Sequence, residues 1–418
     1  MATDDHFPEC GRSRRRGLTG PTVQTLGRAL RCAVLLTVFL ALAGCAAAPI
    51  RLNPITAEAQ EKATIAGIPG ARYWGDRPPL GLDRWLEASD ADLRRDYGGV
   101  FQKPHNYLAI SGGGAHGAFG AGLLVGWTEH GTRPEFTVVT GISTGALIAP
   151  FAFLGPTYDP VLRKVYTEVS TEDIIERRSL PVIIRNDAVA SNRPLRRLIA
   201  RYIDDDMIAA LATEHRRGRS LLIGTTNLDA ARPVTWNISR IAASGAKGAR
   251  DLIHDVILAS ASIPGVFPPV LIEVEADGRR FQEIHVDGGV TSQVFLYPAG
   301  LPWKQVTERL KVPGRPKLYM IRNSQTTPQF KSIDRRILPI MARSLSSLIR
   351  TQGIGDMATI YFATRRDNVD FHLAYIPDSF NGAPGEPFDR EYMQRLFTLG
   401  NQMARKGYSW VTGPKVPE

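Results

Sequence analysis

The sequence has few cysteines and no apolar run long enough to cross a membrane near its amino end. Three cysteines in 418 residues cannot form a disulfide framework. The apolar run at residues 33–43 is shorter than the roughly 20 residues that a membrane-spanning helix needs. With 22% charged and 43% hydrophobic residues, the chain is not a disordered, collagenous or polytopic membrane protein. Its length predicts two to three domains.

Residues 1–44 have the composition of a secretory signal. A basic segment precedes the apolar run, which ends in Leu42-Ala-Gly44 immediately before Cys45. This ending resembles the lipobox of bacterial lipoproteins, in which the cysteine is acylated and becomes the first residue. We therefore expect a lipoprotein signal over 1–44 and lipidation at Cys45, with a buried helix as the alternative. By resemblance to other bacterial lipoproteins, Ala46 is compatible with sorting to the outer membrane.

Positive charge is concentrated in the carboxy-terminal part of the chain. The formal net charge is +10, and residues 301–418 alone contain 18 Lys and Arg against 10 Asp and Glu. No zinc, helix-turn-helix or RNA-binding signature accompanies this charge, so nucleic acid is not an expected partner. The charge is compatible with an anionic membrane surface and equally with a solvated basic face.

The order of strand-like and helix-like segments predicts an α/β fold with a largely parallel sheet. Residues 45–103 are predicted to be a tether and pre-domain segment, with one short helix near 82–95. The main domain is expected over 104–300, and a basic α/β extension packed on it over 301–418. Strands are expected at 107–110, 135–140, 221–224, 283–286 and 317–321, and helices at 118–130 and 144–154.

Glycine-rich turns follow the first two predicted strands. They are Gly112-Gly113-Gly114-Ala-His116-Gly117 and Gly141-Ile-Ser143-Thr-Gly145. The second is a G-x-S-x-G turn between a strand and a helix, where glycines allow a sharp turn that exposes the serine oxygen. Because both turns should lie at the carboxyl edge of the sheet, the first would offer backbone N–H groups as an oxyanion hole beside Ser143.

A serine nucleophile needs a base. The only histidine after residue 287 is His372, whose apolar surroundings at 370–375 are typical of a strand interior and favour a structural role. Asp287 is the better candidate because it closes a strand before Gly288 and Gly289, and a carboxylate within hydrogen-bond reach can take the hydroxyl proton. An ordinary Asp-Gly-Gly turn is the alternative.

The first glycine turn also matches the G-x-G-x-x-G fingerprint of dinucleotide-binding proteins. That fingerprint requires an acidic residue at the end of the next strand, about 20 residues further on. Here the strand ends in Thr140-Gly141, and Glu135 stands at its beginning. A dinucleotide-binding enzyme therefore remains a weak alternative.

The two turns and the Asp287-Gly-Gly segment, in this order, resemble the patatin-like phospholipase family over roughly residues 106–300. Residues 225–229 and 259–269 are also similar to it. The resemblance implies a three-layer patatin-like fold with a central, largely parallel sheet. It also implies a Ser143–Asp287 dyad, an acyl-enzyme intermediate and an oxyanion hole. The remaining motif positions would support these groups: Gly117, Gly141, Gly145, Gly288, Gly289 and His116, which stands where the family commonly has arginine.

The expected function is hydrolysis of membrane lipid esters by a lipid-anchored envelope enzyme. An esterase or thioesterase for soluble substrates and a non-catalytic lipid-binding lipoprotein are the alternatives. Neither a metal nor an organic cofactor is expected, because no His, Cys or Asp cluster has ligand spacing. The expected partners are the lipid substrate and a membrane surface, contacted through the anchor and the basic carboxy-terminal region. The sequence does not predict the oligomeric state.

Two carboxy-terminal segments have helical patterns. In 333–352, an apolar stripe formed by Ile337, Met341, Leu345 and Leu348 is expected to pack on the core. The alternative is an interfacial helix that meets anionic phospholipid. Residues 389–405 are expected to form a closing helix whose apolar face packs on the domain.

Overall fold

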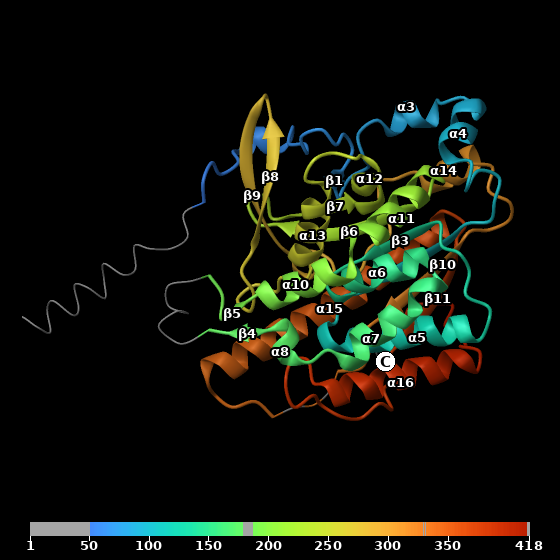
Figure 1. The fold of residues 1–418 in the computed structure, drawn as a ribbon. Helices are drawn as coiled ribbons and strands as arrows, with labels where there is room; N and C mark the ends of the chain where they lie inside the picture. The colour runs from blue at the N-terminus through green and yellow to red at the C-terminus, as the bar shows by residue number, and fades with distance from the viewer. Residues whose placement is uncertain (1–50, 179–186, 329, 331, 416–418) are drawn as a thin grey trace, which may run out of the picture. The chain divides into compact units, whose positions relative to one another are not determined.

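The computed structural model describes residues 51–178, 187–328, 330 and 332–415 (Figure 1). The predicted signal at 1–44 and the predicted lipidation site Cys45 lie outside these residues. Among the described helices, none combines the length and the hydrophobicity needed to cross a membrane.

Nine of the described strands form one sheet. Its five neighbouring strands β6, β3, β2, β10 and β11 run parallel, while β7 and β9 both pair antiparallel with β6. The expectation of an α/β fold with a central, largely parallel sheet is confirmed. The strands are β1 (Arg72–Trp74), β2 (Asn106–Ile110), β3 (Val138–Gly141), β6 (Ser220–Asn227), β7 (Arg232–Asn237), β8 (Val270–Ala276), β9 (Arg279–Asp287), β10 (Lys317–Arg322) and β11 (Asp370–Tyr375). Two short strands, β4 (Glu176–Arg177) and β5 (Ala190–Ser191), pair separately.

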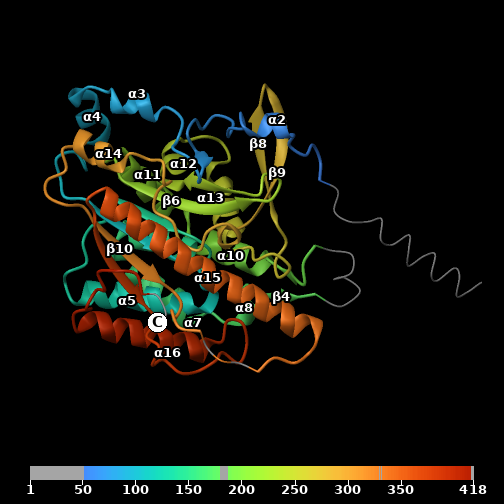
Figure 2. The same ribbon diagram turned by 180° about the vertical axis from the view of Figure 1, so that it is seen from behind.

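Helices lie on both faces of this sheet (Figures 1 and 2). The longer ones are α5 (Gly117–Glu129), α6 (Thr144–Leu154), α7 (Asp159–Glu168), α10 (Arg193–Tyr202), α11 (Asp205–Arg216), α13 (Ala249–Ser260), α15 (Ile337–Arg366) and α16 (Arg390–Arg405). The shorter ones are α2 (Ala57–Gln60), α3 (Leu82–Leu86), α4 (Asp90–Tyr97), α8 (Thr171–Ile174), α12 (Ile238–Ala243) and α14 (Trp303–Arg309). Single 3₁₀ turns are η2 (Gly114–His116), η3 (Pro156–Tyr158) and η4 (Gly288–Val290).

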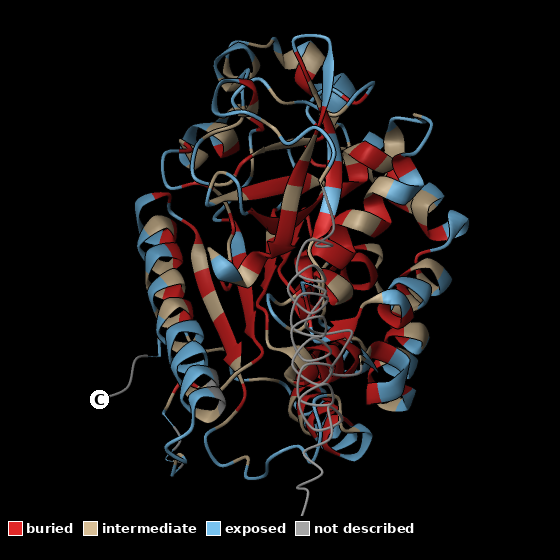
Figure 3. Cartoon of the chain, turned by 90° about the vertical axis from the view of Figure 1, so that its left-hand side faces the viewer, coloured by how far each residue is buried: buried red, intermediate tan, exposed pale blue. Residues whose placement is uncertain are grey.

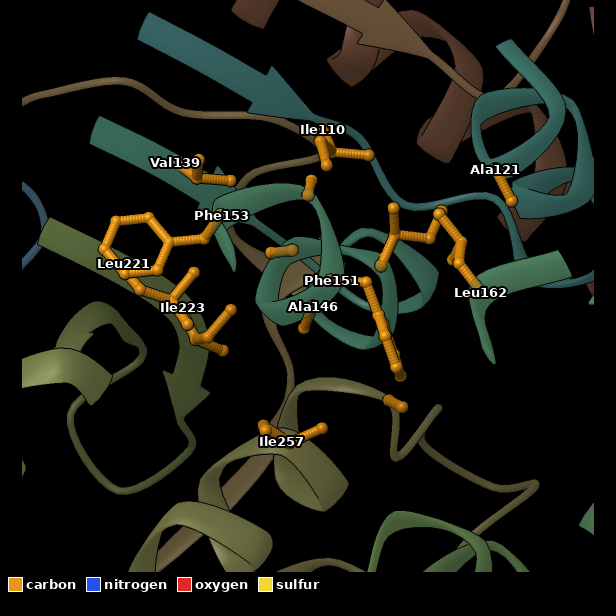
Figure 4. Close-up of a cluster of buried hydrophobic side chains, with 14 of the residues drawn as sticks. Ile110, Ala121, Val139, Ala146, Phe151, Phe153, Leu162, Leu221, Ile223 and Ile257 are labelled. Carbon is orange, nitrogen blue, oxygen red and sulfur yellow. The ribbon is translucent and has the colours of Figure 1, made fainter. Parts of the chain in front are cut away.

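Alternate residues of the central strands face different helical layers, as the two-residue period of a strand requires. On one face, Leu108 and Ile110 of β2 belong to the cluster that contains the buried side chains of α5, α6 and α13. On the other face, Tyr107 and Ala109 pack in a cluster with Met357 of α15. Figure 4 shows the first face, where β2, β3 and β6 meet α6. The strands are largely buried in Figure 3, so the sheet is a rigid base for the loops at its edge.

The outer helix α16 packs on α5. Gly122 of α5 makes the close approach possible, because a Cβ there would lie 2.0 Å from the carbonyl oxygen of Phe397. Met393, Leu396 and Phe397 are buried, as the apolar face of the 389–405 segment indicated. Strands β10 and β11 also come from the region after residue 300, so this region contributes to the central sheet itself.

Several element boundaries differ from the prediction, including those of strands β6 and β9, which are longer than predicted. The helix expected at 82–95 is split into α3 and α4, because the Ser89 side chain accepts from the Asp92 N–H and starts a new helix. Strand β3 begins at Val138 rather than at 135, since its neighbours β2 and β6 begin at the same level. Helix α15 extends to Arg366, well past the predicted end at residue 352. It passes through Gly353, where a Cβ would lie 3.1 Å from the Arg322 side chain.

Candidate active site

The carboxyl ends of the adjacent strands β2 and β3 bring the two glycine-rich turns together. Ile110 and Gly141, the last residues of these strands, lie opposite each other in the parallel register. The two turns are in close contact, since a Cβ added to Gly112 would lie 3.3 Å from the Cβ of Ser143. Asp287 arrives from β9, whose end pairs with Thr225 of β6. Segments more than 140 residues apart in the sequence therefore meet at one edge of the sheet.

Ser143 occupies a strained turn between β3 and α6. Its φ of 55° and ψ of −123° are unusual for a residue with a side chain, and such conformations often mark functional sites. The backbone N–H of Ser143 donates to the Ser260 hydroxyl over 3.0 Å. Gly145 is needed for this turn, because a Cβ there would lie 2.3 Å from the Ile110 carbonyl oxygen. The turn thus holds a serine that is 8% exposed at the start of a helix.

The Asp287 carboxylate is buried and accepts a hydrogen bond from the Gly289 N–H, 2.7 Å from Asp287 Oδ1. Burial raises the pKa of Asp287 to about 6, although the nearby Ser143 hydroxyl and the Gly289 N–H both act to lower it. A carboxylate with this pKa is ionised at neutral pH and is more basic than an exposed aspartate, which suits proton transfer from the serine.

The glycine loop is fixed from two sides. The backbone carbonyl oxygen of Gln293 accepts a hydrogen bond from the Gly112 N–H over 3.0 Å. Asn323 donates from its side chain to the Ser111 carbonyl oxygen over 2.9 Å. In this structure the Gly112 N–H is therefore engaged, whereas the expected oxyanion hole needs its donors free to point at the substrate. Gly113 and Gly114 remain candidates, with φ values of 153° and 56° that favour glycine.

Residues 108–299 match the family model described as patatin-like phospholipase. This chain contains a patatin-like phospholipase domain. The match spans just under half of the chain and includes Ser143, Asp287 and the glycine loop. Patatin-like phospholipases are lipid acyl hydrolases, so lipid acyl hydrolysis is supported at the level of the family.

Several solved structures match this chain, and one of them is a distant neighbour from a bacterium. The crystal structure of VipD from Legionella pneumophila is similar with a TM-score of 0.31 and 13% sequence identity. The similarity covers 73% of this chain and 67% of the VipD chain. The search of curated proteins gave no match.

The supporting glycines of the patatin-like domain lie where the catalytic-edge segments touch. A Cβ at Gly117 would lie 2.1 Å from Thr144 Oγ1, and one at Gly288 would lie 2.5 Å from the Gly224 carbonyl oxygen. A Cβ at Gly141 would be 2.4 Å from the Gly145 carbonyl oxygen, and a Cβ at Gly289 would be 2.9 Å from Asp287 Oδ1. Small residues are thus required for the turns to approach one another.

The two histidines considered from the sequence differ in position. His116 lies at the glycine loop, where its ring packs on that of Tyr392 with centroids 5.8 Å apart. Burial lowers the pKa of His116, so the residue at the family's arginine position is neutral at neutral pH. His372 lies on β11, two strands beyond β2, and its ring packs on Tyr319 and Trp410. The structure therefore does not bring His372 to Ser143.

Three positioning residues of the patatin-like domain and its surroundings were not assigned roles from the sequence. Ser260 holds the Ser143 N–H and donates to the Gly224 carbonyl oxygen over 2.7 Å. Gln293 joins the glycine loop to the Gly289 carbonyl oxygen, to which its Nε2 donates over 2.6 Å. Asn323 follows β10. Ser260 lies within the 259–269 segment that resembles the family, whereas no local pattern marks Gln293 or Asn323.

No three His, Cys, Asp or Glu side chains lie together as a possible metal site within the described ranges. The side chains at the carboxyl edge are instead a hydroxyl, a carboxylate and amides. This set is suited to nucleophilic acyl transfer with a backbone oxyanion hole.

Proposed function

We propose that the protein is a serine acyl hydrolase that cleaves carboxylic ester bonds of membrane phospholipids. The observation that carries the proposal is the placement of the Ser143 hydroxyl next to the buried Asp287 carboxylate, beside the glycine loop. The two groups supply a nucleophile and its base without a histidine. The patatin-like domain around them supports a lipid ester as the substrate.

In the acylation step, Ser143 Oγ attacks the ester carbonyl carbon while its proton passes to the Asp287 carboxylate. The carbonyl oxygen becomes an oxyanion, which the N–H groups of Gly113 and Gly114 would stabilise at the start of η2. The bond to the alcohol oxygen then breaks, and Asp287 gives its proton to that leaving oxygen. The acyl group remains on Ser143 as an ester, and the lysophospholipid departs.

In the deacylation step, water takes the place of the leaving alcohol. Asp287 accepts a proton from the water as its oxygen attacks the acyl carbonyl carbon. When the second tetrahedral intermediate collapses, the bond to Ser143 Oγ breaks and Asp287 returns the proton to the serine. The fatty acid is released, and both side chains regain their starting states.

Fatty-acid release by the parent protein and a Ser143→Ala variant tests the proposal. We expect the parent to release fatty acid from phospholipid vesicles, and the folded variant to lose about 10⁴-fold or more in rate. A short-chain soluble ester serves as the second substrate. Hydrolysis of that ester alone would select the esterase alternative, and equal release by both proteins would exclude Ser143 as the nucleophile.

The proposed location is the bacterial outer membrane, with the chain anchored through acylated Cys45. The support comes from the sequence of residues 1–46, and an anchor would hold the enzyme where a water-insoluble substrate is concentrated. We expect a Cys45→Ser variant to shift from the acylated to the unacylated mass after expression in a bacterium. Identical masses for the two proteins, apart from the substitution, would contradict this location.

A further inference from the structure

Helix α15 has different surroundings along its length. In its carboxy-terminal half, Gly353, Met357, Ile360 and Thr364 are buried at helical spacing. This face packs on the sheet, where Met357 and Ile360 join the cluster of Tyr107 and Ala109. The amino-terminal half extends beyond these contacts along the molecular surface, as Figure 2 shows. One continuous helix thus contains an anchored half and a solvent-facing half.

Four described apolar residues of the amino-terminal half are exposed to solvent. Exposed fractions are 76% for Ile337, 62% for Met341, 48% for Leu345 and 68% for Leu348. The expectation that this stripe packs on the core is wrong. Leu348 is nine residues from the buried Met357, which corresponds to roughly 180° around a helix. The helix therefore packs on the sheet through the face of Met357, opposite Leu348. We call the four exposed residues Ile337, Met341, Leu345 and Leu348 the docking stripe.

The docking stripe is an unusual surface for a soluble protein. Ile340 and Ile349 beside it are 49% and 40% exposed, and they extend its apolar area. Such contiguous apolar surface commonly marks an interaction site. The amphipathic character of the helix is consistent with insertion of one face into the boundary between lipid headgroups and acyl chains.

Charge along the same segment favours an anionic surface. Between residues 333 and 355 the chain has four arginines and one acidic residue, Asp334, which pairs with Arg336 over 3.5 Å. The arginines are Arg335, Arg336, Arg343 and Arg350. At about 100° per residue, Arg336, Arg343 and Arg350 lie on the face opposite the docking stripe, which is the arrangement of an interfacial helix with one basic and one apolar face. A buried protein interface would need matched acidic partners for this charge, whereas an anionic bilayer supplies them over a wide area.

The helix that displays the docking stripe also contacts the candidate active site. Gln352 accepts a hydrogen bond from the Gln293 side chain over 3.2 Å, and Asp356 accepts one from the Gln293 N–H over 2.6 Å. Gln293 in turn accepts from the Gly112 N–H and donates to the Gly289 carbonyl oxygen. One residue therefore links the helix to the glycine loop and to the segment after Asp287.

We propose that the docking stripe is the surface through which this protein binds an anionic phospholipid bilayer. The inference rests on the proposed function for the nature of the substrate, and it adds the place of membrane contact. Insertion of the four apolar side chains would hold α15 in the interface, and the contacts through Gln293 would keep the catalytic turns beside the lipid. The described residues alone thus provide a membrane contact that does not require the lipid anchor.

Vesicle binding by a triple variant, Met341→Ser with Leu345→Ser and Leu348→Ser, tests the proposal. The full chain with Cys45→Ser and Ser143→Ala is the reference, so that neither acylation nor turnover affects binding. On vesicles of phosphatidylglycerol and phosphatidylcholine, we expect the triple variant to bind at least about tenfold more weakly than the reference. Leu80→Ser is the matched control, since Leu80 is 96% exposed away from α15 and its loss should not change binding.

Hydrolysis rates of variants that carry the same substitutions distinguish a failure of this proposal from a failure of the proposed function. In the chain that retains Ser143, the triple variant should hydrolyse a short soluble ester at the parental rate and vesicle phospholipid more slowly. If the triple variant binds vesicles weakly but neither it nor the parent hydrolyses the ester, the result supports the docking stripe and contradicts the proposed function. Should the triple variant unfold, Leu348→Ser alone provides the comparison.

Unchanged binding by the folded triple variant would overturn the proposal. Conversion of a dimer to a monomer, with vesicle binding unaltered, would identify the stripe as a contact between two copies and would also overturn it. Equal loss of binding to vesicles of phosphatidylcholine alone would contradict the preference for an anionic surface.

Discussion

An Asp287→Asn variant is expected to hydrolyse esters with a kcat/KM about 10³-fold below that of the parent protein. An asparagine has nearly the same shape and can accept the hydrogen bond that Gly289 now donates to the carboxylate. It cannot take the proton of the Ser143 hydroxyl, so the nucleophile loses its base. The loss therefore isolates the chemistry of the carboxylate from its packing.

The same substitution is expected to stabilise the folded protein at neutral pH. The pKa of Asp287 is about 6 in the folded protein, above its ordinary value of 3.8. The folded state therefore holds the proton more tightly than the unfolded state. As pH rises from about 4 to 6, ionisation increasingly favours unfolding, and the cost is constant above that range. Removal of this cost should raise the free energy of unfolding at pH 8 by about 3 kcal/mol.

Denaturant unfolding at pH 4 and pH 8, with pH profiles of kcat/KM, measures both effects. The gain in stability should be present at pH 8 and nearly absent at pH 4. The parental kcat/KM should increase through about pH 6 and then level off. Asp255→Asn is the control, since burial also raises the pKa of Asp255, which pairs with Arg196 away from the site. Comparable activity losses in both variants would contradict a special role for Asp287.

A Gly145→Ala variant is expected to lose about 10²-fold in kcat/KM, because it displaces the turn that holds Ser143. The added Cβ would lie 2.3 Å from the Ile110 carbonyl oxygen, a backbone atom in the middle of the sheet. Strand β2 is paired on both sides, so the turn must move instead. We expect a loss of about 1–3 kcal/mol in the free energy of unfolding as well.

Gly355→Ala is the control for this substitution. Gly355 lies in α15, and a Cβ there would meet no atom within 4 Å. Alanine has the higher helix propensity, so this variant should retain activity and gain about 0.5–1 kcal/mol. Full activity of Gly145→Ala, measured by hydrolysis of a short ester, would contradict the role assigned to the turn.

The local parts of the candidate site could be predicted from the sequence. The helix after Ser143 begins and ends at the predicted residues, because strand, glycine turn and helix follow one another within a short segment. Asp287 is predicted as the base from its glycines and its place at a strand end, and the structure places it near Ser143. The long-range hydrogen bonds were not found, since Gln293 and Asn323 meet the glycine loop only through the fold.

The orientation of α15 shows a different limit of sequence interpretation. A stripe at helical spacing indicates that one face is apolar, but it does not identify the partner of that face. The buried face of α15 contains Gly353 and Thr364 beside Met357, so its pattern was less conspicuous than the exposed stripe. The engagement of the Gly112 N–H by Gln293 was likewise beyond the reach of the motif.

Covalent capture of the nucleophile tests the central claim most directly. The parent protein is treated with a fluorophosphonate, which reacts with activated serines, and the modified residue is located by peptide mass spectrometry. We predict one adduct on Ser143, much slower labelling in Asp287→Asn and none at position 143 in Ser143→Ala. Stoichiometric labelling of another residue with loss of activity, or full hydrolysis of lipid esters by Ser143→Ala, would contradict the account.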